Sequence, residues 1–286
     1  MSRYRTVKRI IPAPLTSDGA GVAIHRAFPN QQLGELDPFL LLDHMGPMHL
    51  KPGEAAGFPD HPHRGFETVT YMLHGEFKHR DSFGHAGVIG PGDVQWMTAG
   101  SGLVHSEMPG DSVVKNGGRL EGFQLWVNLP ARDKMKAPRY QELSAAHIPV
   151  ARTADGLAEV KIIAGEALGQ KGGVETQIPI QYLHIKLGAG GKFVQEVPAN
   201  LAAMLYVFKG SVDLDGKKAP QFHLVALGAG DLVEISAQEP AELLLLAAEP
   251  IGEPIARYSP FVMNTEAEIQ QAFKDFRDGK MGRIEG

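Results

Sequence analysis

YMLHG, residues 71–75, and YVFKG, residues 206–210, are the stretches that decide the fold of this 286-residue chain. Each is a run of aromatic and aliphatic residues closed by a glycine, which is typical of a buried strand followed by a tight turn. The two stretches lie in opposite halves of the chain and match at their tyrosines and glycines. Such a match indicates an internal repeat.

A second pair of similar stretches follows in the same order. VIGPGDV, residues 88–94, resembles VALGAGDL, residues 225–232. Each half then has the pattern strand, glycine turn, strand, Gly-Asp turn, strand; the alternative is a chance similarity among glycine-rich strand ends. We expect two tandem β-barrels of similar fold. The polar run at residues 131–136, followed by Pro138, places their boundary between domains at 1–133 and 134–286.

Composition favours the same all-β class. The 34 glycines and 20 prolines are spread along the chain and separate short apolar runs, as in sandwiches and barrels. The clearest helix signal is near the C-terminus, where Asn264 or Thr265 would cap a short helix that Gly279 ends. Its apolar stripe would be formed by Ile269, Phe273 and Phe276.

Charge and cysteine content exclude several classes of function. The formal net charge of -5 gives no basic footprint for nucleic acid, so we expect no direct nucleic-acid binding. The absence of cysteine excludes disulfides, thiolate metal sites and thiol catalysis. Pro12 and Pro14 precede any apolar run of signal-peptide length, and no run is long enough to cross a bilayer. We expect a cytoplasmic protein with no membrane partner.

HPHRGFE, residues 61–67, carries the first candidate chemistry. Residues i and i+2 of a strand share a face, so His61 and His63 can point at one atom. His105 and Glu107 form a second pair with the same spacing. If the two strands are neighbours, three imidazoles and one carboxylate converge. Glu67 is the competing carboxylate, and it reaches the same point only if the strand bends after His63.

This set of ligands suits a divalent transition metal such as Fe, Mn, Ni, Cu or Zn. Four protein ligands would leave open positions on an octahedral ion, which favours catalysis over a closed structural site. In the second half, the repeat places Glu196 and Pro198 opposite the first pair, and Leu243 and Leu245 opposite the second. Proline and leucine cannot bind a metal, so we expect an apolar interior without metal ligands in the second barrel.

Longer stretches resemble the pirin family, whose members have two cupin domains in one chain. The stretches that carry the resemblance are DPFLLLDH (37–44), GFPDHPHRGFETVTY (57–71), QWMTAG (95–100), HSEMP (105–109), QLWVNLP (124–130) and PFVMNT (260–265). They are spread over nearly the whole chain.

The resemblance implies one metal ion, usually iron, bound in the N-terminal barrel by His61, His63, His105 and Glu107, with Glu67 outside the set. It implies quercetin 2,3-dioxygenase activity, in which Fe(II) is the expected ion and a flavonol-like aromatic molecule and dioxygen are the substrates. Glu107 would also accept the proton of the substrate hydroxyl. The alternative is a non-enzymatic, metal-dependent regulator that binds a protein partner, because both roles need the same ligands.

The pocket around such a site would need apolar walls and a polar rim. Phe58, Phe66 and Met97 are candidates for the walls, and Arg64 and Asp43 for the rim. The two tryptophans of the chain, Trp96 and Trp126, lie in apolar runs and are assigned to the core.

Overall fold

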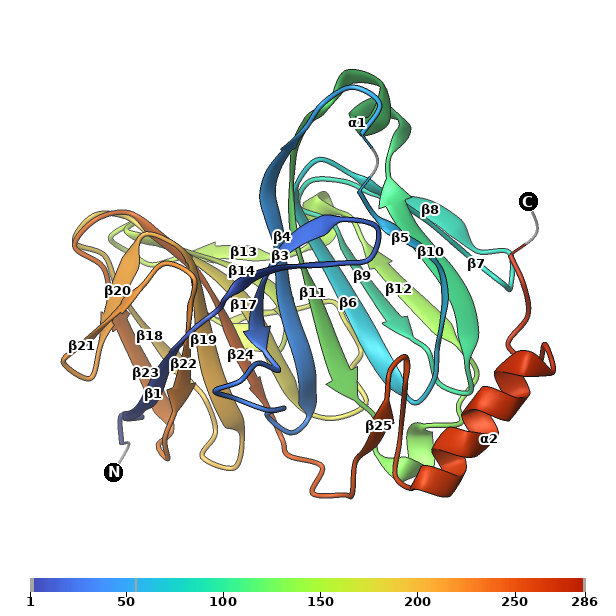
Figure 1. Ribbon diagram of the computed structural model, residues 1–286. Coiled ribbons are helices and arrows are strands. Elements are labelled where there is room, and N and C mark those ends of the chain that lie inside the picture. The colour runs from blue at the N-terminus through green and yellow to red at the C-terminus, as the bar shows by residue number, and fades with distance from the viewer. Residues whose placement is uncertain (1–2, 55, 285–286) are drawn as a thin grey trace. The chain divides into compact units, whose positions relative to one another are not determined.

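The computed structural model describes residues 3–54 and 56–284 and divides them into two compact units (Figure 1). The described parts of residues 15–26, 38–145 and 251–286 form the first unit. The described parts of residues 1–14, 27–37 and 146–250 form the second unit. Each unit contains a β-barrel made from one seven-stranded and one four-stranded sheet.

The first unit holds the barrel that carries the HPHRGFE stretch. Its seven-stranded sheet has the order β12 (Arg139–Leu143), β9 (Val94–Thr98), β6 (Phe66–His74), β11 (Gly118–Asn128), β4 (Phe39–Leu50), β3 (Val22–Phe28), β2 (Leu15–Asp18). Its four-stranded sheet has the order β5 (Phe58–His63), β10 (Leu103–Pro109), β7 (Phe77–Asp81), β8 (Ala86–Ile89). The unit also contains helix α1 (Asp111–Asn116), a hairpin of β25 (Ala256–Tyr258) and β26 (Phe261–Met263), and helix α2 (Glu266–Arg277).

The second unit holds a barrel of the same design. Its seven-stranded sheet has the order β1 (Val7–Pro12), β22 (His223–Leu227), β19 (Ala202–Lys209), β24 (Ala241–Ala248), β17 (Ile180–Leu187), β14 (Ala158–Ala164), β13 (Val150–Arg152). Its four-stranded sheet has the order β18 (Lys192–Glu196), β23 (Leu232–Ser236), β20 (Ser211–Leu214), β21 (Lys217–Pro220). Strands β15 (Glu166–Ala167) and β16 (Gln170–Lys171) form a separate small hairpin.

The strand orders of the two barrels correspond, which confirms the predicted pair of β-barrels. Strand β6, which holds most of YMLHG, is third in its sheet, between β9 and β11. Strand β19, which holds most of YVFKG, is likewise third, between β22 and β24. The second match is wrong by one strand. Residues 88–94 join β8 to β9, whereas residues 225–232 join β22 to β23. The two connections are alike because each needs a glycine with positive φ, Gly92 at 86° and Gly230 at 153°.

This shift changes the counterparts of the candidate ligands. The strands that match β5 and β10 are β18 and β23, so Leu243 and Leu245 of β24 are not opposite His105 and Glu107. Strands β18 and β23 instead bury Phe193, Val233 and Ile235 in the core of the second unit. The interior is therefore apolar, as expected, but different residues make it so.

Two strands and one helix belong to a different unit from the domain in which they were predicted. Strand β1 pairs with β22 of the second unit, whereas β12 pairs with β9 of the first, so the division after residue 133 is not the one that the units follow. Helix α2, predicted as part of the C-terminal domain, belongs to the first unit. The sheet edge with which each strand pairs decides the unit to which β1 and β12 belong. Single-sequence patterns do not encode which edge a strand joins.

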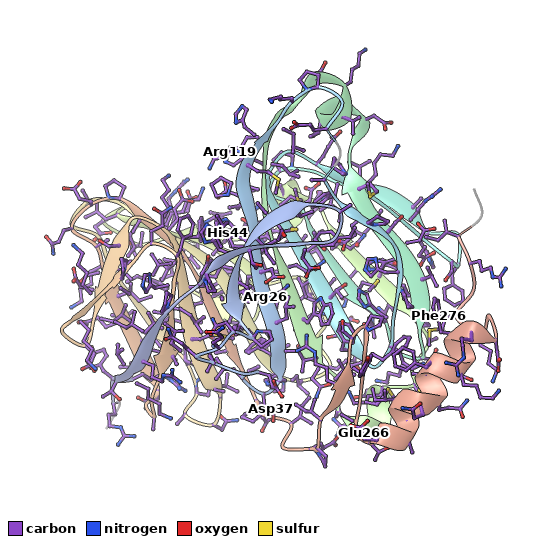
Figure 2. All side chains as sticks on the ribbon, in the orientation of Figure 1. Arg26, Asp37, His44, Arg119, Glu266 and Phe276 are labelled. Atoms are coloured by element: carbon purple, nitrogen blue, oxygen red, sulfur yellow. The ribbon has the colours of Figure 1, made fainter. Side chains whose placement is uncertain are left out.

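Helix α2 itself was predicted closely. Thr265 caps it with a reciprocal capping box to Glu268, and the helix ends at Arg277, two residues before Gly279. Figure 2 shows the side chains of this helix, from Glu266 at its start to Phe276 near its end. Ile269 is buried, and Phe273 packs against the same apolar cluster. No helix among the described residues is long and apolar enough to span a membrane.

A pair of a buried histidine and a glutamate occurs at the same place in both barrels. His44 on β4 contacts Glu121 on β11 at 3.0 Å. His184 on β17 contacts Glu242 on β24 at 3.2 Å. In both cases the glutamate lies two residues before the one paired with the histidine in the strand register. The repeat thus extends to polar positions that the sequence comparison did not align.

Candidate metal centre

The three predicted histidines meet on two adjacent strands of the first unit. Strands β5 and β10 are antiparallel neighbours, and their register places His61 opposite His105 and His63 opposite Leu103. Side-chain alternation turns all three imidazoles to one side of the four-stranded sheet. Their ring centroids are 4.4 to 4.9 Å apart, and one nitrogen from each ring lies within 4.8 Å of the other two.

The hydrogen bonds of His61 and His63 fix which nitrogens face each other. His61 Nδ1 donates to the Pro59 carbonyl oxygen at 2.7 Å, and His63 Nδ1 lies 3.4 Å from that of Pro260. A carbonyl oxygen only accepts, so each Nδ1 carries a hydrogen. The two Nε2 atoms face each other at 3.0 Å. If both rings are neutral, two lone pairs meet at this distance, and they repel unless a cation lies between them.

Burial keeps two of these rings neutral. His63 and His105 are 3% and 0% exposed, and desolvation holds the pKa of each well below the usual 6.5. Neither ring nitrogen of His105 has a hydrogen-bond partner in the described structure. A buried polar group without a partner is costly and calls for an explanation. Neutral imidazoles with converging lone pairs are the donors that a divalent transition metal takes, so these residues fit such an ion.

Glu107, the predicted fourth ligand, lies beside the histidines with hydrogen bonds of its own. Thr70 Oγ1 donates to Glu107 Oε1 at 2.7 Å, and Gln124 Nε2 donates to Oε2 at 2.8 Å. Its oxygens are not among the described atoms that gather within 4.8 Å. The carboxylate lines the same cavity as His61 and His63. Each of its oxygens keeps a lone pair for a metal or a proton.

Glu67, the competing carboxylate, is bound elsewhere. Thr98 Oγ1 donates to Glu67 Oε1 at 2.6 Å, on neighbouring strands of the seven-stranded sheet. Burial raises the pKa of Glu67 above its usual value. This residue is absent from the cavity lining that contains Glu107.

His61 and His63 line a cavity of about 370 Å³, within the size range of small-molecule sites. Of the expected wall and rim residues, Phe58 and Asp43 line it. Trp126, expected in the core, lines it as well and packs edge-on against His63. Further lining comes from Leu41, Gln124, Ser259 and Pro260, none of which the sequence patterns indicated.

The other three expected residues have different places. Phe66 is fully buried and packs against Trp126 with ring centroids 4.4 Å apart, so it supports the wall from behind. Met97 lies in a separate apolar cluster with Ala99 and Leu103. Arg64 is buried rather than at the rim, and its Nη1 pairs with Asp275 at 2.9 Å.

Arg26 fixes the carboxylate of Asp43, one of the residues that line the cavity. Arg26 donates from Nε and Nη2 to the two carboxylate oxygens of Asp43, at 2.8 and 2.6 Å (Figure 2 labels Arg26). Its Nη2 also pairs with Asp18. A bidentate pair of this kind fixes the direction of the carboxylate. Asp43 therefore offers fixed acceptor oxygens to a molecule in the cavity.

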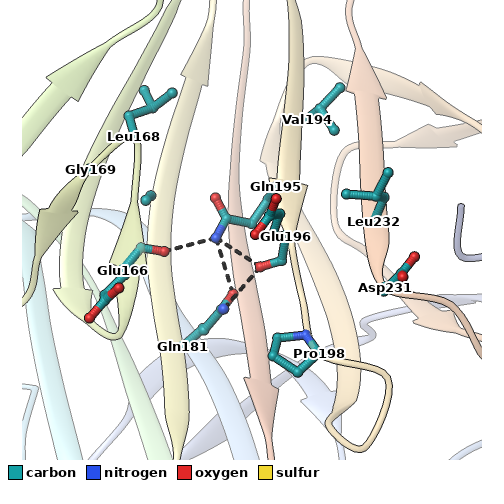
Figure 3. Close-up of a pocket in the computed structure, with 11 residues that line it drawn as sticks. Glu166, Leu168, Gly169, Gln181, Val194, Gln195, Glu196, Pro198, Asp231 and Leu232 are labelled. Atoms are coloured by element: carbon teal, nitrogen blue, oxygen red, sulfur yellow. Dashed lines mark hydrogen bonds between the residues drawn. The ribbon is translucent and has the colours of Figure 1, made fainter. Parts of the chain in front are cut away.

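The second unit has a groove of a different kind. It measures about 570 Å³, and its lining includes Glu166, Gln181 and Gln195 (Figure 3). Gln195 Nε2 donates to the carbonyl oxygens of Glu166 and Glu196 at 2.8 and 3.0 Å. Among the described residues, no second group of three His, Asp or Glu side chains gathers as the three histidines do.

Comparison with known proteins agrees with the fold. The model of the pirin family matches residues 21–127, and that of the pirin C-terminal cupin domain matches residues 182–282. A pirin-like protein of Solanum lycopersicum is 44% identical over 286 residues, covering 98% of this chain and 94% of that protein. Pirin of Homo sapiens is 44% identical over 273 residues, covering 93% and 90%.

A solved structure is similar over the same length. The crystal structure of quercetin 2,3-dioxygenase from Acinetobacter baumannii superposes with a TM-score of 0.94 at 37% sequence identity. The match covers 99% of this chain and 100% of that one. Both barrels are therefore cupin domains, and the chain belongs to the pirin family.

Proposed function

We propose that this protein is a metal-dependent dioxygenase of the quercetin 2,3-dioxygenase type, acting on flavonol-like aromatic molecules. The observation that carries the proposal is the convergence of three imidazoles, two of which, His61 and His63, line a cavity together with Glu107 and Trp126. The similarity to a solved structure named quercetin 2,3-dioxygenase supports the reaction class.

The proposed ion is Fe(II), held by His61, His63 and His105, with Glu107 beside it. When bound, it would supply a Lewis acid that lowers the pKa of a substrate hydroxyl and a site at which dioxygen can react. Zn, Mn, Ni and Cu remain chemically compatible with the same donors.

The residues of the chain would bind the substrate and move its proton. Trp126 and Phe58 present aromatic surface to a planar ring system. Glu107 would accept the hydroxyl proton, since Thr70 and Gln124 hold its carboxylate in one orientation. Asp43, which lines the same cavity, would accept hydrogen bonds from hydroxyl groups of the substrate.

Oxygen uptake tests this proposal directly. Protein loaded with Fe(II) without oxygen is mixed with quercetin and air-saturated buffer, beside His105→Ala treated identically. We expect uptake by the parent and none by the variant, because the variant loses one buried donor. No uptake by a parent shown to hold one metal would overturn the flavonol reaction. That result would favour the regulator, for which partner affinity would have to change on metal removal.

A further inference from the structure

We propose that helix α2 and the β25–β26 hairpin position the metal centre, acting through the buried Arg64–Asp275 ion pair. This inference rests on the proposed metal site but not on its substrate. It makes Asp275 a positioning residue, because its contacts reach the ligands only through Arg64.

Arg64 is the residue directly after the ligand His63, and it connects both strands that carry ligands. Its Nε donates to the carbonyl oxygen of Ser101 at 2.7 Å, in the turn that leads into β10 and His105. Its Nη1 donates to Asp275 Oδ2 at 2.9 Å. The Arg64 side chain is only 5% exposed, so its charge depends on Asp275 for compensation.

The backbone of the β25–β26 hairpin also contacts the backbone of Arg64. Val262 N donates to the Arg64 carbonyl oxygen at 3.1 Å, next to a bridge between Arg64 and Phe261. The Pro260 carbonyl faces His63 Nδ1 at 3.4 Å. A partner on the second nitrogen of a histidine ligand sets its tautomer and its ring direction.

Lys134 connects the hairpin to the turn after His63 by hydrogen bonds. Its Nζ, fully buried, donates to the carbonyl oxygens of Gly65 and Val262 at 2.8 and 3.1 Å and to Asn128 Oδ1 at 2.6 Å. The turn is therefore bonded to β26 from two sides.

Asp275 is built to keep its place on the helix. Gln271 Nε2 and Lys280 Nζ donate to its Oδ1 at 2.8 and 2.7 Å, which leaves Oδ2 for Arg64. Its side chain is 11% exposed, whereas Asp278 on the same helical segment is 42% exposed and pairs with Lys274. Asp275 faces the ligand strands, and Asp278 is the matched residue that does not.

Removal of the Asp275 charge leaves a buried guanidinium without compensation. Arg64 would then move toward water and release Ser101, and with it the relative placement of His63 and His105. Partners outside the ligand set typically change metal affinity by about 10- to 100-fold. We expect a loss of that size in Asp275→Asn.

The experiment measures Co(II) binding to the full chain. The dissociation constant comes from competition with a chelator, and the visible spectrum of bound Co(II) reports the ligand geometry. We expect Asp275→Asn to bind about 10-fold or more weakly, with an altered spectrum. We expect Asp278→Asn to match the parent in both. A lower melting temperature of metal-free Asp275→Asn with an unchanged constant and spectrum would mean a structural role only and would overturn the proposal.

Arg64→Lys provides a second test if Asp275→Asn does not fold. Lysine keeps the charge that balances Asp275, but one ammonium lacks the planar fork that joins Asp275 to Ser101. Weaker Co(II) binding by Arg64→Lys supports the positioning role, and parent-like binding overturns it. No Co(II) binding by the parent would overturn the metal site as well, whereas a failed oxygen-uptake assay alone would leave this inference intact.

Discussion

Glu107 differs from the three histidines in that neighbouring side chains already satisfy part of its bonding. Thr70 and Gln124 each donate one hydrogen bond to it, and both are neutral. The carboxylate is therefore oriented without a cationic partner of its own. A charge in this state attracts a metal ion and remains a competent base, which is the pair of roles that the proposed reaction requires.

Glu107→Gln tests these roles at constant size. The amide removes the charge and replaces one acceptor oxygen by an NH₂ group, so Thr70 and Gln124 can no longer each donate to an oxygen of their own. Because a positioned base contributes about 10²–10⁴-fold, we expect quercetin-dependent oxygen uptake to fall by at least about 100-fold. The matched control is Glu67→Gln, another buried glutamate bonded to a threonine, for which we expect near-parent uptake. The reverse order of effects would assign the catalytic carboxylate to Glu67.

Sequence reasoning brought His61, His63 and His105 together because strand alternation turns residues two apart to one face. It missed Pro260 and Asp275 because their partners, His63 and Arg64, lie about two hundred residues earlier and no local pattern links them. Trp126 was assigned to the core because a half-buried cavity wall has the same apolar surroundings in sequence as a core position.

At the scale of elements, the turn between β5 and β6 has the least room for change. Gly65 has a φ of 87°, and a Cβ added there would meet the Val262 carbonyl oxygen at 1.9 Å. Gly84, in the turn between β7 and β8, also has a φ of 87° but nothing within 4 Å of such a Cβ. Substitutions at these two glycines therefore separate the cost of a left-handed backbone from the cost of contact with the β25–β26 hairpin.

Gly65→Ala should therefore cost far more than Gly84→Ala. Left-handed backbone costs a residue with a Cβ about 1–2 kcal/mol, which is the loss expected for Gly84→Ala in urea unfolding. Gly65→Ala adds the clash with Val262, so we expect a larger loss together with weaker Co(II) binding. Equal losses in the two variants would show that the hairpin yields easily and does not constrain the turn.

Elements with strong local signals were predicted, and those defined by pairing were not. The capping box and apolar stripe located α2, and the tyrosine-to-glycine pattern located β6 and β19. The Gly-Asp connections were equated across the repeat although they join different strands, because chain reversal between two sheets needs the same residues at either corner. The unit to which β1, β12 and α2 belong depends on edges and packing surfaces that only the folded chain provides.

At the scale of the whole molecule, one strand order supports two different interiors. The first unit fills the space beside β5 and β10 with ligands and a cavity, and the second fills the matching space with Phe193, Val233 and Ile235. The His–Glu pairs are nevertheless kept in both. We therefore assign the shared pairs to the stability of the barrel, and the histidines of β5 and β10 to the proposed metal site.

The pair in the second unit predicts how that unit responds to acid. The hydrogen bond from His184, with Lys209 as a second donor, lowers the pKa of Glu242 from 4.5 to about 2. Above about pH 4.5 the glutamate is ionised in both states, and its contribution to stability is complete. Below that pH the unfolded chain takes up the proton first, so the contribution is lost as the pH falls toward 2.

Glu242→Gln should therefore be less stable than the parent above about pH 4.5, by an amount that shrinks as the pH falls toward 2. Burial also lowers the pKa of His184, so both proteins lose stability below about pH 6.5, and their difference reports Glu242 together with its interaction with His184. Urea unfolding of the metal-free protein measures it by far-ultraviolet circular dichroism, while fluorescence follows the first unit, which holds both tryptophans. Glu234→Gln, which breaks an exposed pair with Lys192, is the control and should show little difference at any pH. If the difference in unfolding free energy between the parent and Glu242→Gln stays constant down to pH 2, the pair stabilises the unit by its packing rather than by the charge of Glu242.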